Sequence, residues 1–128
     1  MGFDYRAIYQ LPGAGSIDLG GSPSRAIKES LVPFMENGVD FGSVKVDENV
    51  ITALEIYFDQ VKDEINDIHE SIYKMDNEAY VGNYGEDRVA ATHQSEVLSN
   101  LHDFLWRVIG AAQTANRYPG HEVEISYS

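Results

Sequence analysis

The sequence contains no cysteine. This absence excludes disulfides, thiolate metal ligands and cysteine nucleophiles, and it leaves the cellular compartment open. The chain also lacks an apolar run long enough to cross a membrane, and its first residues do not combine a basic segment with an apolar stretch. If the protein leaves its cell, we therefore expect it to be secreted without a cleavable signal peptide. A virion or a cytoplasmic location is the alternative.

Positive charge is scarce as well. Nine Lys and Arg residues stand against 21 Asp and Glu residues, which gives a net charge of −12 at pH 7. Because so acidic a surface repels the phosphate backbone, direct binding of nucleic acid is not expected, and mimicry of DNA is a minor alternative. A chain of 128 residues with 43% hydrophobic residues fits one domain with a modest core.

The strongest pattern in the sequence begins after Asp47. Eight apolar residues follow one another at alternating spacings of 3 and 4, which is the a/d repeat of a helix that packs along one face. Asp47 suits the N-cap, and Glu48 suits the first turn near the positive end of the helix dipole. The pattern predicts a helix over about 48–75, about 40 Å long. Its apolar stripe consists of Ile51, Leu54, Phe58, Val61, Ile65, Ile68, Ile72 and Met75.

A turn and a second helix follow. Residues 76–85 interrupt the repeat with glycines and asparagines, and Glu86 and Asp87 then supply an acidic first turn. Arg117 and the sequence Pro119-Gly120 mark the other end, which predicts a helix over about 86–117. Its stripe, again at spacings of 3 and 4, consists of Ala91, Gln94, Leu98, Leu101, Leu105, Val108, Ala112 and Ala115.

The first 46 residues differ from the rest of the chain. Alternating aromatic and polar residues favour a short strand over Phe3–Leu11, the pair Gly20-Gly21 favours a loop, and Ser24 suits the N-cap of a short helix. We expect this segment to be a loop-rich arm with little core of its own. At the other end, residues 123–128 form a tail whose alternation favours a short strand.

Together these elements predict a mainly α protein. An antiparallel two-helix hairpin would form the domain 47–122, preceded by the arm 1–46 and followed by the tail 123–128. One hairpin cannot cover both of its wide apolar faces, so we expect oligomerisation into a helical bundle, an arm that folds back, or both. The predicted hairpin interface consists of Ile51, Leu54, Phe58, Val61, Ile65, Ile68, Ile72, Leu98, Leu101, Leu105 and Val108.

The residues show no arrangement typical of a catalytic or metal site. The four histidines occur in neither a Glu-x-x-His nor a His-Glu-x-x-His spacing. Asp59, Asp63 and Asp67 recur at the helical spacing i, i+4, which a divalent cation can use, but they fall on the predicted polar face where water solvates them. We therefore expect no enzymatic activity, no cofactor and no metal. An enzyme that uses the Asp-rich helix and a metal is the remaining alternative of this class.

Two short motifs mark the ends of the predicted hairpin. Tyr80-Val81-Gly82 lies in the turn, and Tyr118 and Glu122 form a Tyr-x-x-x-Glu motif at the end of the second helix. In order and separation, these motifs resemble the WXG/ESX group of small proteins exported by type VII secretion. Members of that group are helical hairpins with a Trp-x-Gly turn and a Tyr-x-x-x-Asp/Glu signal after the second helix.

The resemblance covers residues 47–122. It implies pairing of hairpins into a four-helix bundle, and recognition of Tyr118 and Glu122 by an export ATPase. The sequence departs from the family pattern at Tyr80, where the family prefers Trp, and in the long N-terminal extension. Pro119 and Gly120 also interrupt the tail motif. Without the resemblance, Tyr80 would simply pack the turn and Tyr118 would close the open end of the hairpin.

The sequence thus predicts a non-enzymatic helical-hairpin interaction protein that resembles a type VII secreted protein or its partner. The expected partners are proteins, either a second copy or a paired helical hairpin. The loop-rich arm favours an alternative, a structural component of a larger assembly such as a phage virion (capsid, connector or tail protein), because such arms commonly become ordered against neighbouring subunits. An acidic inhibitor or immunity protein is a further alternative.

Overall fold

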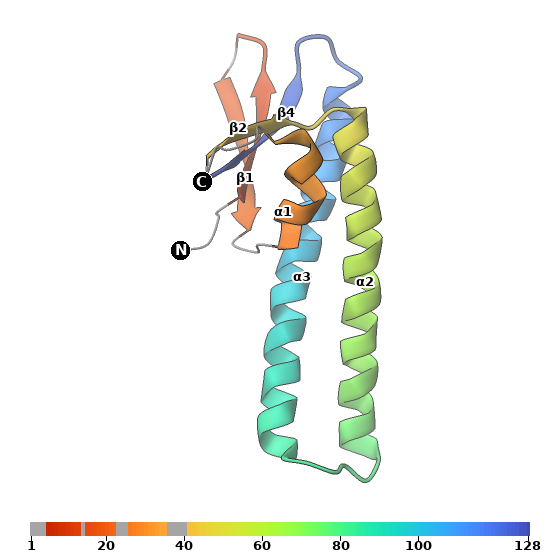
Figure 1. Ribbon diagram of the computed structural model, residues 1–128. Helices are drawn as coiled ribbons and strands as arrows, with labels where there is room; N and C mark the ends of the chain where they lie inside the picture. The colour runs from red at the N-terminus through yellow and green to blue at the C-terminus, as the bar shows by residue number, and fades with distance from the viewer. Residues whose placement is uncertain (1–4, 14, 23–25, 36–40) are drawn as a thin grey trace.

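The computed structural model describes residues 5–13, 15–22, 26–35 and 41–128. Two long helices, α2 (Glu48–Asn77) and α3 (Tyr84–Ala115), lie side by side as an antiparallel hairpin (Figure 1). A sheet and the short helix α1 (Ala26–Leu31) pack at the end of the hairpin where the chain enters α2 and leaves α3. We call the described residues of 5–61 and 101–128 the head, and residues 62–100, which extend beyond the sheet, the projecting hairpin.

The sheet has four antiparallel strands in the order β2-β1-β4-β3. These strands are β1 (Tyr5–Leu11), β2 (Gly15–Ser22), β3 (Gly42–Lys45) and β4 (Glu122–Tyr127). The two central strands come from opposite ends of the chain and pair from Tyr5 with Tyr127 to Gln10 with Glu122. Alternate side chains of both strands face the helices, so this face of the sheet is buried. Its buried residues are Tyr5, Ala7, Tyr9, Val123, Ile125 and Tyr127.

The prediction of a mainly α hairpin with a loop-rich arm is wrong. Of the described residues, 61% are helical and 22% are in strands, so the protein is an α/β mixture. The segment before α2 supplies three of the four strands and α1, and the side chains of Tyr5, Ile27 and Leu31 are completely buried. The sheet therefore covers one apolar face of the hairpin, for which the prediction gave oligomerisation into a helical bundle, an arm that folds back, or both. Phe3 and the predicted cap Ser24 lie outside the described residues.

The glycines that suggested a loop are instead needed by the second strand. A Cβ atom at Gly21 would lie 2.8 Å from the carbonyl oxygen of Tyr5, closer than real Cβ atoms approach, so only glycine allows β2 to pair with β1 here. Gly20 has a φ of +96°, and the register shifts nearby, between Ala7 and Ile8. The pair Gly20-Gly21 thus shapes an irregular edge strand instead of ending one.

The helices begin and end at residues that satisfy their terminal backbone groups. Asp47 accepts a hydrogen bond from the Val50 amide at 3.0 Å, as its predicted role of N-cap requires. Asn83 caps α3 by accepting from the Glu86 amide at 3.2 Å, which starts this helix two residues before the predicted position. A short 3-10 helix, Val32–Phe34, follows α1. Among the described helices, none has the length and apolar character that a membrane span requires.

One hydrophobic core joins the sheet, α1 and the hairpin. Helix α3 contributes through two adjacent faces, one toward α2 and one toward the sheet, which explains why its predicted apolar face was so wide. The central position of α3 in the head accounts for the complete burial of its large side chains. Those with exposures of 0–1% are Leu101, Phe104, Leu105 and Val108.

Candidate functional site

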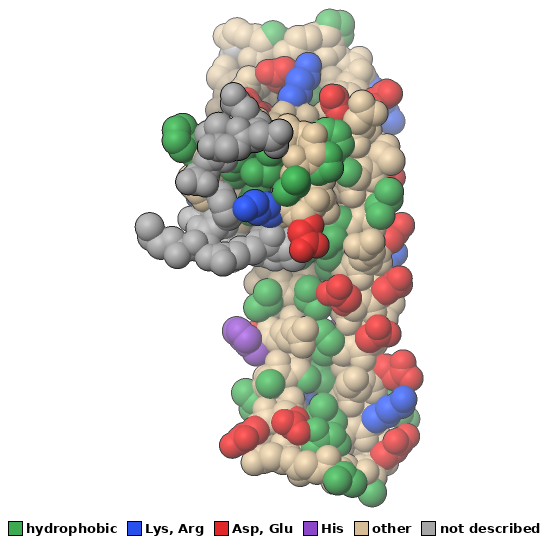
Figure 2. Space-filling model, in the orientation of Figure 1, with side chains coloured by type: hydrophobic (Ala, Val, Ile, Leu, Met, Phe, Trp, Pro, Cys, Tyr) green, Lys and Arg blue, Asp and Glu red, His purple; other side chains and the backbone are tan. Residues whose placement is uncertain are grey.

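The apolar seam between the helices continues into the projecting hairpin but loses its cover there. In the head, Leu54 and Val61 of this seam are fully buried. Beyond the head, Ile65, Ile68 and Ile72 are only half-buried. Figure 2 shows hydrophobic side chains at the surface along the junction of the helices below the head, with acidic side chains along the α2 side. Apolar surface that a core leaves uncovered is a candidate for contact with another molecule.

Of the predicted interface residues, the structure buries those in the head except Phe58, and it leaves Phe58 and those of the projecting hairpin partly open. The buried ones are Ile51, Leu54, Val61, Leu101, Leu105 and Val108. The half-buried ones are Phe58, Ile65, Ile68, Ile72 and Leu98. All of them lie on α2 or α3.

Polar side chains connect the two helices where the apolar seam is thin. The imidazole Nε2 of His69 and the hydroxyl of Ser95 share a hydrogen bond of 3.0 Å, and Ser95 is buried. Within the head, near its boundary with the projecting hairpin, the His102 ring stacks on Phe58 with 4.5 Å between ring centroids. These contacts fix the register of the helices with little apolar burial, so the projecting hairpin is aligned but not deeply packed.

An ion pair closes the far end of the hairpin. Arg88 donates to both carboxylate oxygens of Asp76, from Nε at 2.9 Å and from Nη2 at 3.1 Å, and its Nη1 donates to the hydroxyl of Thr92 at 3.1 Å. The Tyr84 hydroxyl donates to the same carboxylate at 2.5 Å. The hydrogen bonds from Arg88 and then Tyr84 hold the pKa of Asp76 below its usual range. The bidentate geometry sets the angle at which α3 leaves the turn.

The turn itself contains the predicted motif residues Tyr80 and Gly82. The Tyr80 hydroxyl donates to the Asp87 carboxylate, and this hydrogen bond raises the pKa of Tyr80. Gly82 has a φ of +134°, and a Cβ there would lie 3.3 Å from the Tyr80 ring, so glycine permits the turn to close over that ring. The tip, which we define as residues 76–89, is thus ordered by side-chain contacts. Between these two motif residues, Val81 is 95% exposed.

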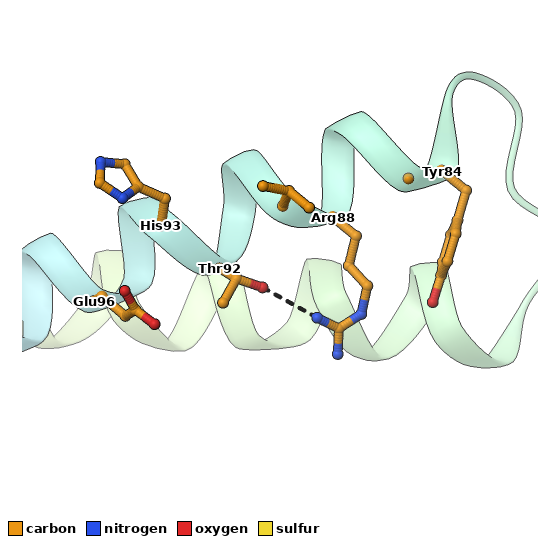
Figure 3. A pocket seen from close by; sticks show the side chains of 7 residues that line it. Tyr84, Arg88, Thr92, His93 and Glu96 are labelled. Carbon is orange, nitrogen blue, oxygen red and sulfur yellow. Dashed lines mark hydrogen bonds between the residues drawn. The ribbon is translucent and has the colours of Figure 1, made fainter.

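A shallow hollow of about 430 Å³ lies beside the tip on α3. Figure 3 shows Tyr84 and Arg88 extending toward α2, whereas His93 points away from it. The hollow is open and has a mostly apolar lining. Such a hollow suits a side chain of a partner protein better than a small-molecule substrate, which binds in a more enclosed pocket. Its lining residues are Tyr84, Gly85, Arg88, Val89, Thr92, His93 and Glu96.

The structure places the other predicted motif, Tyr118 and Glu122, at the head end of the molecule. Tyr118 is exposed in the turn after α3, and its ring lies 5.4 Å from that of His121. Glu122 begins β4, and its carboxylate lies 3.5 Å from the Nζ of Lys45. The two motif residues therefore lie on either side of a turn, in which Gly120 has a φ of +83°, and not on one helical face.

The carboxylates that suggested a metal site do not converge. Asp59, Asp63 and Asp67 are exposed on α2. In the described ranges, no group of three or more His, Asp or Glu side chains is placed to hold a metal ion. The surface charge of this helix is thus distributed along it and not focused at a point.

The contacts of Asp76, Tyr84 and Arg88 were not predicted from the sequence. One signal for them was present in the sequence: the acid Asp76 begins the predicted turn and the base Arg88 follows it, and such a pair comes together when the two helices pack antiparallel.

Comparisons of the chain with family models, with curated proteins and with solved structures find no match.

Proposed function

We propose that this protein is a non-enzymatic interaction protein that binds a partner protein through its projecting hairpin, with the tip as the main contact. The observation that carries this proposal is a tip that exposes Tyr80, Val81 and Tyr84 while polar contacts order its backbone. Asp76, Arg88 and Tyr84 fix the ends of the turn, and Tyr80 is held by Asp87. Between these restraints lies Val81, whose side chain is 95% exposed.

Preorganisation explains why the tip suits binding. Association costs the ordering of loops and side chains, and a turn that is already fixed avoids part of that cost. Tyrosine is enriched at protein interfaces because it offers a large apolar ring and a polar hydroxyl. Tyr80 and Tyr84 are in contact, with ring centroids 6.3 Å apart, and both are partly exposed. They form a rigid aromatic surface beside Val81.

The charge around the tip indicates what kind of surface it binds. Glu78, Glu86 and Asp87 surround the turn, and the chain as a whole carries a charge of −12. Opposite charges at the rim of an interface speed association and select the partner. We therefore expect a protein partner with an apolar pocket rimmed by Lys and Arg.

The resemblance to the WXG/ESX group gives a more specific form of this proposal. In that form the protein is a type VII secreted protein or its partner, and the exposed Tyr118 belongs to an export signal. Its support is the order of the Tyr80-Val81-Gly82 and Tyr118-x-x-x-Glu122 motifs along the chain.

Photocrosslinking in the source cell tests the binding surface. A photoreactive amino acid at Val81 should give one discrete crosslinked protein, whereas the same group at Ile56, which is 58% exposed on α2 within the head, should not. Val81→Asp should abolish the crosslink formed from position 89, and the matched Ile56→Asp should leave it unchanged. Equal crosslinking from positions 81 and 56, or no effect of Val81→Asp, would exclude the tip as the contact.

A further inference from the structure

The outer face of α3 within the head carries an exposed Trp106. This residue is the only tryptophan of the chain. Its side chain is 68% exposed, because it lies on the side of the helix opposite the core. Gly110 follows one turn later on the same face. A Cβ at Gly110 would meet nothing within 4 Å, so packing inside the chain does not require glycine there. A glycine inside a helix is nevertheless less favourable than an alanine.

The two residues line one open groove. Leu19 of β2 forms its wall, because the Nε of Arg107 donates to the Leu19 carbonyl at 3.1 Å and holds β2 beside the helix. The groove has a volume of about 520 Å³ and a mostly apolar lining. It thus combines a large protruding ring with a bare stretch of helix backbone. Its lining residues are Leu19, Trp106, Arg107, Ile109, Gly110 and Gln113.

We propose that two copies of the chain pair through this face, with Trp106 of each copy seated on Gly110 of the other. A two-fold axis near position 108, perpendicular to α3, runs the two helices antiparallel and exchanges positions 106 and 110. The same axis places position 103 opposite 113. Asp103 then faces the amide of Gln113, so no like charges meet at this pair. The face is complementary to itself.

The charge distribution favours a second copy at this face. A protein of net charge −12 repels its own copies over most of its surface. Residues 104–121 are an exception, because this stretch contains Arg107 and Arg117 and none of the 21 Asp and Glu residues. Trp106 and Gly110 therefore lie in the part of α3 that has no acidic residue, where repulsion between two copies is weakest. This face is separate from the tip, so the pairing does not rest on the proposed function.

Trp106 reports on the pairing directly, because no other tryptophan contributes to the fluorescence. Sedimentation equilibrium of the full chain over a wide range of concentrations should show a monomer–dimer equilibrium. The tryptophan emission should shift to shorter wavelength over the same concentration range as Trp106 leaves water. A chain that stays monomeric at millimolar concentration, or a dimer whose emission does not shift, would overturn the proposal.

Two variants test the geometry. Trp106→Ala removes the protruding ring, and Gly110→Leu fills the site that receives it; each should weaken the dimer at least about tenfold. Gly110→Leu should not lower the melting temperature of the monomer, since space is open around its Cβ. Tyr73→Ala, which removes an equally exposed aromatic ring from α2, is the matched control and should leave the dimer unchanged. A dimer that either Trp106→Ala or Gly110→Leu leaves intact would overturn the proposed contact.

Discussion

The head and the projecting hairpin contain the same repeat but different degrees of burial. In the head, Leu54 and Val61 of α2 are completely buried, because the sheet and α1 add a further layer over the helix pair. In the projecting hairpin, Ile68 and Met75 occupy the equivalent positions of the repeat and are half-buried. The repeat therefore determines which side of α2 faces α3, whereas the sheet determines how deeply that side is buried.

The difference in burial also means that the head contributes mainly to stability, whereas the projecting hairpin is the region that we propose for binding. Burying a Leu or Ile side chain completely contributes roughly 1.5–3 kcal/mol, and a half-buried one contributes less. The head thus supplies most of the free energy of folding. The projecting hairpin depends more on single polar contacts, such as those of His69 with Ser95 and Arg88 with Asp76. Regions of lower local stability are those from which binding elements are commonly drawn.

The largest expected effect comes from removing the layer that distinguishes the two regions. Deleting residues 1–46 removes β1, β2, β3 and α1, leaves β4 without a partner strand, and exposes the sheet-facing side of α3. We expect the remaining chain to lose its cooperative thermal transition or to aggregate. Circular dichroism and light scattering measure this outcome. A soluble fragment with an unchanged transition would show that the hairpin does not depend on the head.

The same substitution, leucine to alanine, can be made in both regions to compare their burial. Leu54→Ala in the head should lower the free energy of unfolding by about 2–5 kcal/mol, because it creates a cavity in a closed core. Leu98→Ala in the half-buried seam should cost about half as much or less, since water fills the space. Urea denaturation of both variants gives the comparison. Equal losses would contradict the proposed difference in burial.

Acid should loosen the tip. The hydrogen bonds from Arg88 and Tyr84 lower the pKa of Asp76, so the ionised carboxylate stabilises the folded tip above the usual Asp pKa, about pH 4. This contribution is lost as the pH falls through the lowered pKa. Hydrogen exchange of residues 76–92, corrected for the intrinsic rate, should therefore become faster below about pH 4.

The variant Arg88→Leu is the control for the acid effect. It removes the cation that stabilises the ionised Asp76, so its tip should already exchange quickly at neutral pH and respond less to acid. An unchanged exchange rate of the wild-type tip through this range would contradict the role assigned to the ion pair.

The smallest effect on stability is expected at Tyr118. Its side chain is exposed in the turn that follows α3, so Tyr118→Ala should leave the melting temperature within a few degrees of the original value. If the resemblance to type VII secreted proteins is functional, the same variant should no longer be exported by a strain that carries the transporter. Immunoblotting of the culture medium and the cell pellet measures this. Normal export of a folded Tyr118→Ala would exclude the motif as a signal.

The hairpin was predictable from the sequence because its information is local. The signals are the cap at Asp47, the alternating spacing of 3 and 4 from Ile51 to Met75, and the turn-forming residues after Asp76, and each depends only on residues close together in the sequence. Both helices begin and end within two residues of the predicted positions. A helical repeat of this length is specific enough to be recognised by itself.

The sheet was not predictable by the same means. Its central strands pair Tyr5 with Tyr127, so neither strand identifies its neighbour locally. The edge strand β2 contains glycines that strand propensity disfavours, and Gly21 is required only because β1 approaches so closely. Of the candidate site, the turn motif at Tyr80 and Gly82 was visible in the sequence. The ion pair between Asp76 and Arg88 became visible only with the register of the two helices.

The central claim is that one continuous hairpin consists of a stable part inside the head and a less stable projecting part. Hydrogen exchange of the native chain at neutral pH, followed by mass spectrometry, tests it directly. The account predicts the slowest exchange in 50–61 and 101–115, at rates set by global unfolding, and exchange at least about tenfold faster in 65–98 through partial opening from the tip. Uniform protection along the whole of α2 and α3 would contradict the account, because it would make the hairpin a single cooperative unit.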